Sequence, residues 1–204
     1  DLTSNGVWNN VSSVYTFTPT ADNANISYTE LQNYLQSYSV EIKTSRAAGT
    51  QVGSVVFDAG VSANKNSSSG SAFIFTITSG GDVQFNNSFS LRNLSYPEYM
   101  GYRLYVNAGG SVRIGGVLDL SGSTYAGSNG IPAPSYISMV IGGDLVMSGS
   151  GQVLTMGYSR GYSFNPYSGG PGGDQIYTIG GGVDLQAGSV LNANGGAFLS
   201  LGYN

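Results

Sequence analysis

The chain has 204 residues, with 32 Gly, only 7 Lys or Arg, 11 Asp or Glu and a net charge of −4. Good helix formers are scarce and turn formers abundant, which excludes a helical bundle, while 40% apolar and 12% aromatic residues suffice for a core. The chain has no cluster of basic residues, so nucleic acid is not an expected partner. No apolar run reaches the roughly 18 residues that a membrane helix needs. The chain has no Cys and no His, which excludes thiolate metal sites and His-based catalysis.

The N-terminal segment, residues 1–25, is expected to hold a strand at residues 11–18, where β-branched and aromatic residues gather. In one version of assembly this strand crosses to a neighbouring subunit and adds to its sheet. The chain begins at Asp1 rather than Met, so we expect a mature protein whose targeting segment has been removed.

A short helix is predicted next, within residues 26–38. Ser27 and Glu30 have the spacing of a capping box, and Leu31 and Leu35 follow at helical spacing. We expect this helix to cover the first coil, because an open end of stacked strands is an unpaired sheet edge.

A five-residue signature then recurs five times, at starts 28, 29, 33 and 38 residues apart: Gly, a small or acidic residue, apolar, any, apolar. Before the last four copies stands a second Gly, which predicts a turn where positive φ is cheap only for Gly. Apolar stretches before and after the signature predict that each repeat consists of three short strands. When repeats stack, the two apolar positions of the signature form two columns that point inward and are buried. The predicted inward columns are Val55, Val83, Val112, Leu145, Val183 and Phe57, Phe85, Ile114, Met147, Leu185; the outward column is Val56, Gln84, Arg113, Val146, Asp184.

The predicted fold is therefore all-β: one domain, a parallel β-helix or solenoid of about five coils over residues 39–204 with a short N-terminal capping helix. A Gly-rich β-sandwich is the alternative. Two loop inserts, residues 121–136 and 157–175, are rich in Gly, Ser, Tyr and Pro and are expected to stand off the coils. The second insert offers aromatic side chains for ligand or lateral subunit contacts: Tyr158, Tyr162, Phe164 and Tyr167.

Candidate chemistry is sparse. Asp82 and Asp144 share one turn position two coils apart, about 10 Å, near the carboxylate separation of inverting glycosidases, but Asp is an ordinary turn residue. Asp174 ends a Gly-rich stretch that matches one copy of a calcium-binding nonapeptide, a site that needs tandem copies. We therefore expect no catalytic residue, no cofactor and no metal, with Asp174 as the one calcium candidate.

The stretch from residue 26 to residue 63 resembles a segment of large bacterial surface exoproteins of the filamentous haemagglutinin type. There, a helix such as residues 28–35 leads into a strand such as residues 40–44, a turn, and a strand such as residues 53–57. The later coils, to residue 196, look like the same repeats. The resemblance implies secretion, a right-handed β-helix and a role in adhesion or surface fibres, and it carries no catalytic residues.

The leading hypothesis is a structural subunit of an extracellular bacterial or archaeal fibre, a pilus-like or biofilm-matrix filament that polymerises end to end with itself. The residues expected at the assembly interface are Val11, Val14, Tyr15, Phe17, Phe198, Leu199 and Leu201. The alternative is an adhesin or carbohydrate-binding β-helix module that holds glycan or a cell surface. A polysaccharide lyase or hydrolase ranks last, because no cluster of Asp, Arg or Lys is present.

Overall fold

The computed structural model describes residues 2–45, 52–65, 72–93, 101–121, 135–157, 172–194 and 201–202. These residues form one helix, α1 (Tyr28–Ser37), and three sheets. Sheet one is ordered β1 (Gly6–Val11), β2 (Val14–Pro19), β3 (Ser39–Lys43), β6 (Ile74–Ser79), β9 (Arg103–Ala108), β12 (Tyr136–Ile141), β15 (Asp174–Ile179), β18 (Leu201–Gly202). Sheet two is β4 (Val55–Phe57), β7 (Val83–Phe85), β10 (Val112–Ile114), β13 (Leu145–Met147), β16 (Val183–Leu185). Sheet three is β5 (Val61–Lys65), β8 (Phe89–Asn93), β11 (Val117–Asp119), β14 (Gln152–Leu154), β17 (Val190–Asn192).

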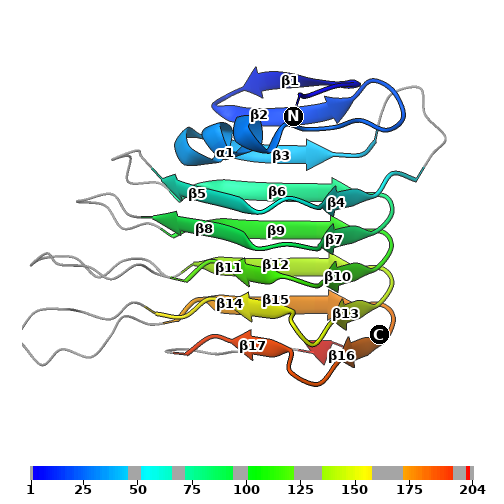
Figure 1. The fold of residues 1–204 in the computed structure, drawn as a ribbon, viewed down its shortest axis with the longest axis vertical. Coiled ribbons are helices and arrows are strands. Elements are labelled where there is room, and N and C mark those ends of the chain that lie inside the picture. The colour runs from blue at the N-terminus through cyan, green and yellow to red at the C-terminus, as the bar shows by residue number, and fades with distance from the viewer. Residues whose placement is uncertain are drawn as a thin grey trace, which may run out of the picture.

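The chain visits the three sheets in a fixed order, from β3–β4–β5 through to β15–β16–β17. We call each such triplet a rung, and the rungs stack one below another in Figure 1. Every pair of neighbouring strands in the rungs is parallel. The described chain is thus an all-β structure of parallel sheets with one helix.

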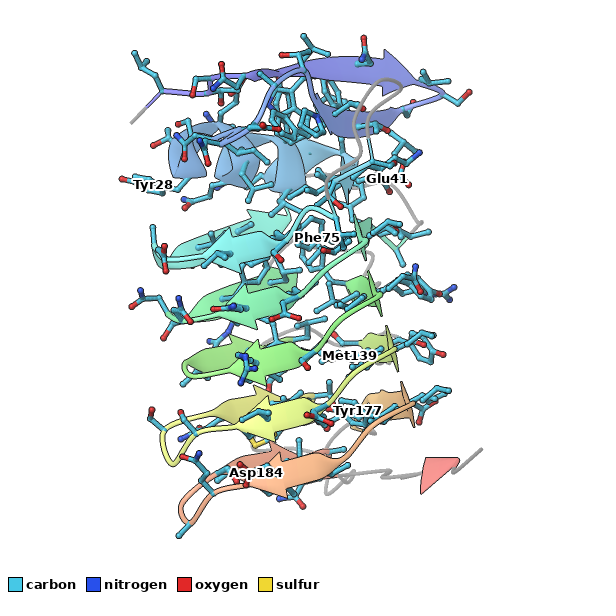
Figure 2. All side chains as sticks on the ribbon, turned by 90° about the vertical axis from the view of Figure 1, so that its right-hand side faces the viewer. Tyr28, Glu41, Phe75, Met139, Tyr177 and Asp184 are labelled. Atoms are coloured by element: carbon cyan, nitrogen blue, oxygen red, sulfur yellow. The ribbon has the colours of Figure 1, made fainter. Side chains whose placement is uncertain are left out.

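The predicted columns of sheet two are confirmed by its strand register. Val112 pairs with Val83 on one side and Leu145 on the other, and Phe85 pairs with Phe57 and Ile114 in the neighbouring column. Alternate residues are buried because successive side chains of a strand point to opposite faces. Side chains of sheet one, such as Phe75, Met139 and Tyr177, fill the same interior and are at most 1% exposed (Figure 2).

Aromatic rings dominate the core of the first two rungs. The Phe57 and Phe85 rings stack with centroids 5.0 Å apart, and Phe75 stacks on Phe89 at 5.5 Å. Phe57 also meets Phe89 edge-on at 5.0 Å, so rings from all three sheets interlock. Offset-stacked and edge-to-face contacts are the favoured aromatic geometries, each contributing about 1 kcal/mol beyond area burial.

The paired glycines at the turns into sheet two are needed for space rather than for positive φ. The positive φ predicted there is wrong: Gly188, φ 97°, is the one glycine with positive φ in the described ranges. A Cβ on Gly109 would collide with the carbonyl oxygen of Gly80, and one on Gly142 with that of Gly109. Backbone packs on backbone from rung to rung at this corner, and only Gly permits that approach.

The strand predicted at residues 11–18 is in fact the second half of a hairpin. β1 and β2 pair antiparallel, and Ser12 and Ser13 form the turn with φ of 53° and 66°. β2 then pairs in parallel with β3 of the same chain. Type I′ hairpin turns require positive φ at both central residues and usually use Asn-Gly or Asp-Gly, so a Ser-Ser turn gives no sequence signal.

The predicted helix is confirmed, and it begins at Tyr28, directly after the Ser27 cap that the sequence indicates. The Ser27 side chain accepts the Glu30 N–H at 3.4 Å, and Leu31 and Leu35 are buried. α1 packs against β3 and β5, so it covers the end of sheet three. The buried Tyr102 hydroxyl, two rungs away, donates to the Leu35 carbonyl oxygen at 2.8 Å, and burial raises its pKa.

Candidate functional site

The N-terminal end is closed by an aromatic cluster between the hairpin and α1, which we call the cap cluster: Trp8, Tyr15, Phe17, Tyr34 and Tyr38. Tyr15 stacks on Tyr34 with centroids 4.2 Å apart, and Trp8 lies 4.7 Å from the same ring. Burial, then the Glu30 carboxylate, raises the pKa of Tyr34. The Trp8 indole N–H is buried without a hydrogen-bond partner in the described structure.

The four residues expected at an N-terminal assembly interface therefore differ in how exposed they are. Phe17 is 3% exposed and Tyr15 packs inside the cap cluster, so both make contacts within their own chain instead of lying open to a neighbour. Val14 is half-buried, whereas Val11 is 66% exposed at the end of β1. Of the four, Val11 has the exposure that a subunit contact requires.

The last described rung of sheet two has an exposed inward column. Val183 and Leu185 continue the two inward columns, in register with Leu145 and Met147, yet they are 41% and 47% exposed. In sheet three the inward column of Leu118 and Val153 continues with Leu191 of β17, which is half-buried. Of the expected C-terminal interface residues, Leu201 begins β18 and pairs with β15, and Phe198 and Leu199 lie outside the described residues.

Asp82 and Asp144 do not form a carboxylate pair but belong to a hydrogen-bond series that we call the turn ladder. In it, each side chain accepts the backbone N–H of the matching residue one rung further on. Ser54 accepts from Asp82 at 3.1 Å, Asp82 from Ser111 at 2.8 Å, Ser111 from Asp144 at 3.0 Å, and Asp144 from Gly182 at 2.7 Å. Both carboxylates thus have structural partners, which explains the residues without invoking hydrolysis.

Asp174 is exposed on the outer face of β15, and the glycines before it have a packing role. A Cβ on Gly173 would collide with the carbonyl oxygen of Ser135, and one on Gly172 would lie 2.7 Å from that of Ala193. No group of three or more acidic residues that could hold a metal gathers within the described ranges. The glycines follow from close backbone approach, so they carry no independent sign of calcium.

Two polar groups inside the stack escaped the sequence analysis. Asp119, 6% exposed, accepts from the Arg92 guanidinium and from the Ser121 N–H. Burial alone would raise the pKa of Asp119, but these donors outweigh it and hold the pKa below its ordinary value of 3.8. Near the last rung, the buried Gln175 amide donates to Thr155 at 3.0 Å and accepts from the Tyr177 hydroxyl at 3.1 Å. Both groups are fully explained by contacts within the chain.

A cavity of about 600 Å³ lies above the free edge of β4, between the hairpin–helix connection and the end of β3. Its walls mix polar groups with apolar side chains, among them Ile26, Leu31 and Val55. The one lysine in its wall, Lys43, is paired with Glu41 at 3.0 Å. Asp22 and Asp58 also line the cavity, and the Asp58 carboxylate accepts from the Asn86 amide at 2.6 Å. No group of three or more acidic residues gathers there among the described residues.

The two loop inserts emerge from one corner of the stack. Each connection from sheet three back to sheet one is long in sequence, and the inserts fall in the connections β11 to β12 and β14 to β15. The aromatic residues expected to make contacts, Tyr158, Tyr162, Phe164 and Tyr167, lie outside the described residues.

No family model matches the chain, and no curated protein or solved structure is significantly similar to it. In the described part, the single helix spans 10 residues, about half of the roughly 20 that a bilayer crossing needs.

Proposed function

We propose that this chain is a structural subunit of an extracellular fibre, built on one right-handed β-helix of about five coils that stacks end to end with other copies. The exposed inward column of the last rung carries the proposal. Val183 and Leu185 occupy positions that are buried in the three rungs before them, so a further strand in register with β16 would cover them. Exposed contiguous apolar surface of this kind marks contact sites.

The opposite end also presents free strand edges, β1 of sheet one and β4 of sheet two. β1 is the free edge of sheet one and carries Val7 and Val11, 47% and 66% exposed. An α-helix is about 10 Å wide, which matches two strand spacings of about 4.8 Å, so α1 and the hairpin add equal height above the first rung. Low charge, 18 Asp, Glu, Lys and Arg in 204 residues, leaves little repulsion between stacked copies.

The test is negative-stain electron microscopy of the purified chain at neutral pH, with Leu185→Lys as the assembly variant. A charge on the exposed last rung should abolish fibres, while Val146→Lys, which alters a half-buried residue on the outward side of sheet two in a middle rung, should leave them unchanged. Dispersed wild-type protein at high concentration, or normal fibres from Leu185→Lys, would overturn the proposal.

An adhesin module is the second candidate, favoured by the common corner from which the loop inserts leave. In repeat folds, insertions that map to one face often form the binding surface. Replacing residues 158–171 with a short Gly-Ser link should abolish binding on a glycan array and leave the circular dichroism spectrum unchanged. An unaltered glycan profile would remove this candidate.

A further inference from the structure

The outer face of sheet one carries an ordered row of three side chains, one per rung. Register places Tyr136 of β12 directly between Arg103 of β9 and Asp174 of β15. The next residue of each strand is buried, so all three side chains point outward. Neighbouring strands lie about 4.8 Å apart, so the positive and the negative residue flank Tyr136 at equal distances.

Both charged groups lack an ionic partner in the described structure. Arg103 and Asp174 are exposed, and the ion pairs that the described residues form are Lys43 with Glu41 and Arg92 with Asp119. Two strand spacings separate them by about 10 Å, too far for a direct bond. The row is therefore an exposed positive group, a half-buried ring that packs against Tyr105 with centroids 5.6 Å apart, and an exposed negative group.

This row is self-complementary under a two-fold rotation. When a second copy is turned by 180° about an axis parallel to β12 and above Tyr136, the strand order reverses while positions along the strands are kept. Arg103 of each copy then faces Asp174 of the other copy, and the two Tyr136 side chains face each other. An axis over β9 or β15 would instead oppose two Arg103 or two Asp174 side chains, so the charges select the axis over β12.

The two neighbouring outward columns obey the same rotation. It brings Tyr105 opposite Ile176 and Asn107 opposite Thr178, because the register sets each pair one rung above and one rung below β12. Val140, 49% exposed, faces Val140 of the second copy. Apolar side chains thus meet apolar ones and polar side chains meet polar ones.

We infer that the outer face of sheet one is a lateral interface between two copies of this chain, related by a two-fold axis parallel to β12. Isologous contact of one patch with itself is the commonest arrangement in homo-oligomers. The face measures about 20 Å along the strands and about 14 Å across β9, β12 and β15, or about 300 Å² per copy. That area is typical of weak, reversible association. The interface lies on the side of the stack, parallel to the stacking direction, and does not depend on fibre formation.

Charge reversal tests the inference by sedimentation velocity at low salt, where exposed charges are least screened. In a dimer of Arg103→Asp, two carboxylates face each other at each of the two former ion pairs. In a dimer of Asp174→Arg, two guanidinium groups face each other at the same places. Each variant alone should therefore dimerise at least about tenfold more weakly than wild type. An equimolar mixture of the two restores both opposite-charge pairs and should dimerise like wild type. Wild-type protein that stays monomeric, or a mixture of folded variants that stays monomeric, would overturn the inference.

Sheet two supplies a matched control. Its outward column also places Val146 between Arg113 and Asp184 at the same rungs. Its strands have three residues and present a single outward column there, so the contact area is too small. The variants Arg113→Asp and Asp184→Arg should dimerise like wild type. Loss of dimers in these variants, with rescue on mixing, would move the interface to sheet two and refute the assignment to sheet one.

Discussion

The Asp82 carboxylate accepts the backbone N–H of Ser111, one rung further along the chain, at 2.8 Å. The bond crosses between rungs rather than within a turn, so it fixes the height and register of one rung on the next. Asp144 repeats it with Gly182 at 2.7 Å. A turn position that resembles half of a catalytic pair is thus part of the stacking device.

Removal of this acceptor should destabilise the fold. In Asp82→Ala the Ser111 N–H loses its partner, and we expect a loss of about 1 kcal/mol in the free energy of unfolding, measured by urea denaturation. Asp82→Asn keeps an acceptor oxygen and should lose less. Asp184→Ala, at an exposed outward position, is the control and should change little. Equal stability of Asp82→Ala and wild type would show that water replaces the carboxylate fully.

The paired glycines give a second prediction, about space. Gly142→Ala should cost about 1–3 kcal/mol of unfolding free energy, because its Cβ collides with the Gly109 carbonyl oxygen and the rungs must separate. Gly60→Ala is matched to it: its Cβ would meet only the Ser88 carbonyl oxygen at an ordinary 3.6 Å. Thermal unfolding followed by circular dichroism compares the two. A Gly60 variant as unstable as the Gly142 variant would contradict the spatial explanation.

The hairpin turn is a site for stabilisation. Ser12 and Ser13 both hold positive φ, which costs L-residues about 1 kcal/mol or more each. Replacing them by Asn-Gly should raise the free energy of unfolding by about 1 kcal/mol, because these residues adopt that backbone readily. Fluorescence of Trp8, the one tryptophan of the chain, reports on the hairpin directly. Unchanged or lower stability would argue against the turn as described.

Acid should weaken the contact between Arg92 and Asp119. The pKa of Asp119 is lowered in the folded chain, so its stabilisation is fully present above the ordinary pKa of 3.8 and is lost as the pH falls through the lowered value. Because the Arg92 side chain is 46% exposed and screened by water, we expect about 1 kcal/mol or less. Urea unfolding at pH 7 and pH 2.5 should show a smaller difference for Asp119→Asn than for wild type. An identical pH response in both proteins would show that Asp119 is not the group responsible for this loss of stability.

Much of this architecture could be predicted from the sequence, because its signals are local and repeated. Apolar residues two apart, such as Val83 and Phe85, recur after each Gly pair and predict the sheet-two register that the structure confirms. The helix was predictable because Ser27 and Glu30 form a capping pattern next to buried leucines.

What could not be predicted depends on unusual local chemistry or on distance along the chain. A Ser-Ser turn carries no hairpin signal, so the strand predicted at residues 11–18 runs through the turn and most of β1 is missed. Asp and Ser are common in turns, so nothing marked Asp82 as an acceptor for the next rung. The row of Arg103, Tyr136 and Asp174 is scattered over connections of unequal length, and only the strand register brings it together.

The rungs also set how the chain responds to load. The first strands of successive rungs begin at Ile74, Arg103, Tyr136 and Asp174, so each rung stores about 30–40 residues in about 4.8 Å of height. Pulled straight, about 30 residues reach about 100 Å. A rung that unfolds from one end of the stack would therefore release a length of chain about twenty times the height that the rung occupied. Under a pulling force the rungs would unfold one after another, so the chain would extend in steps.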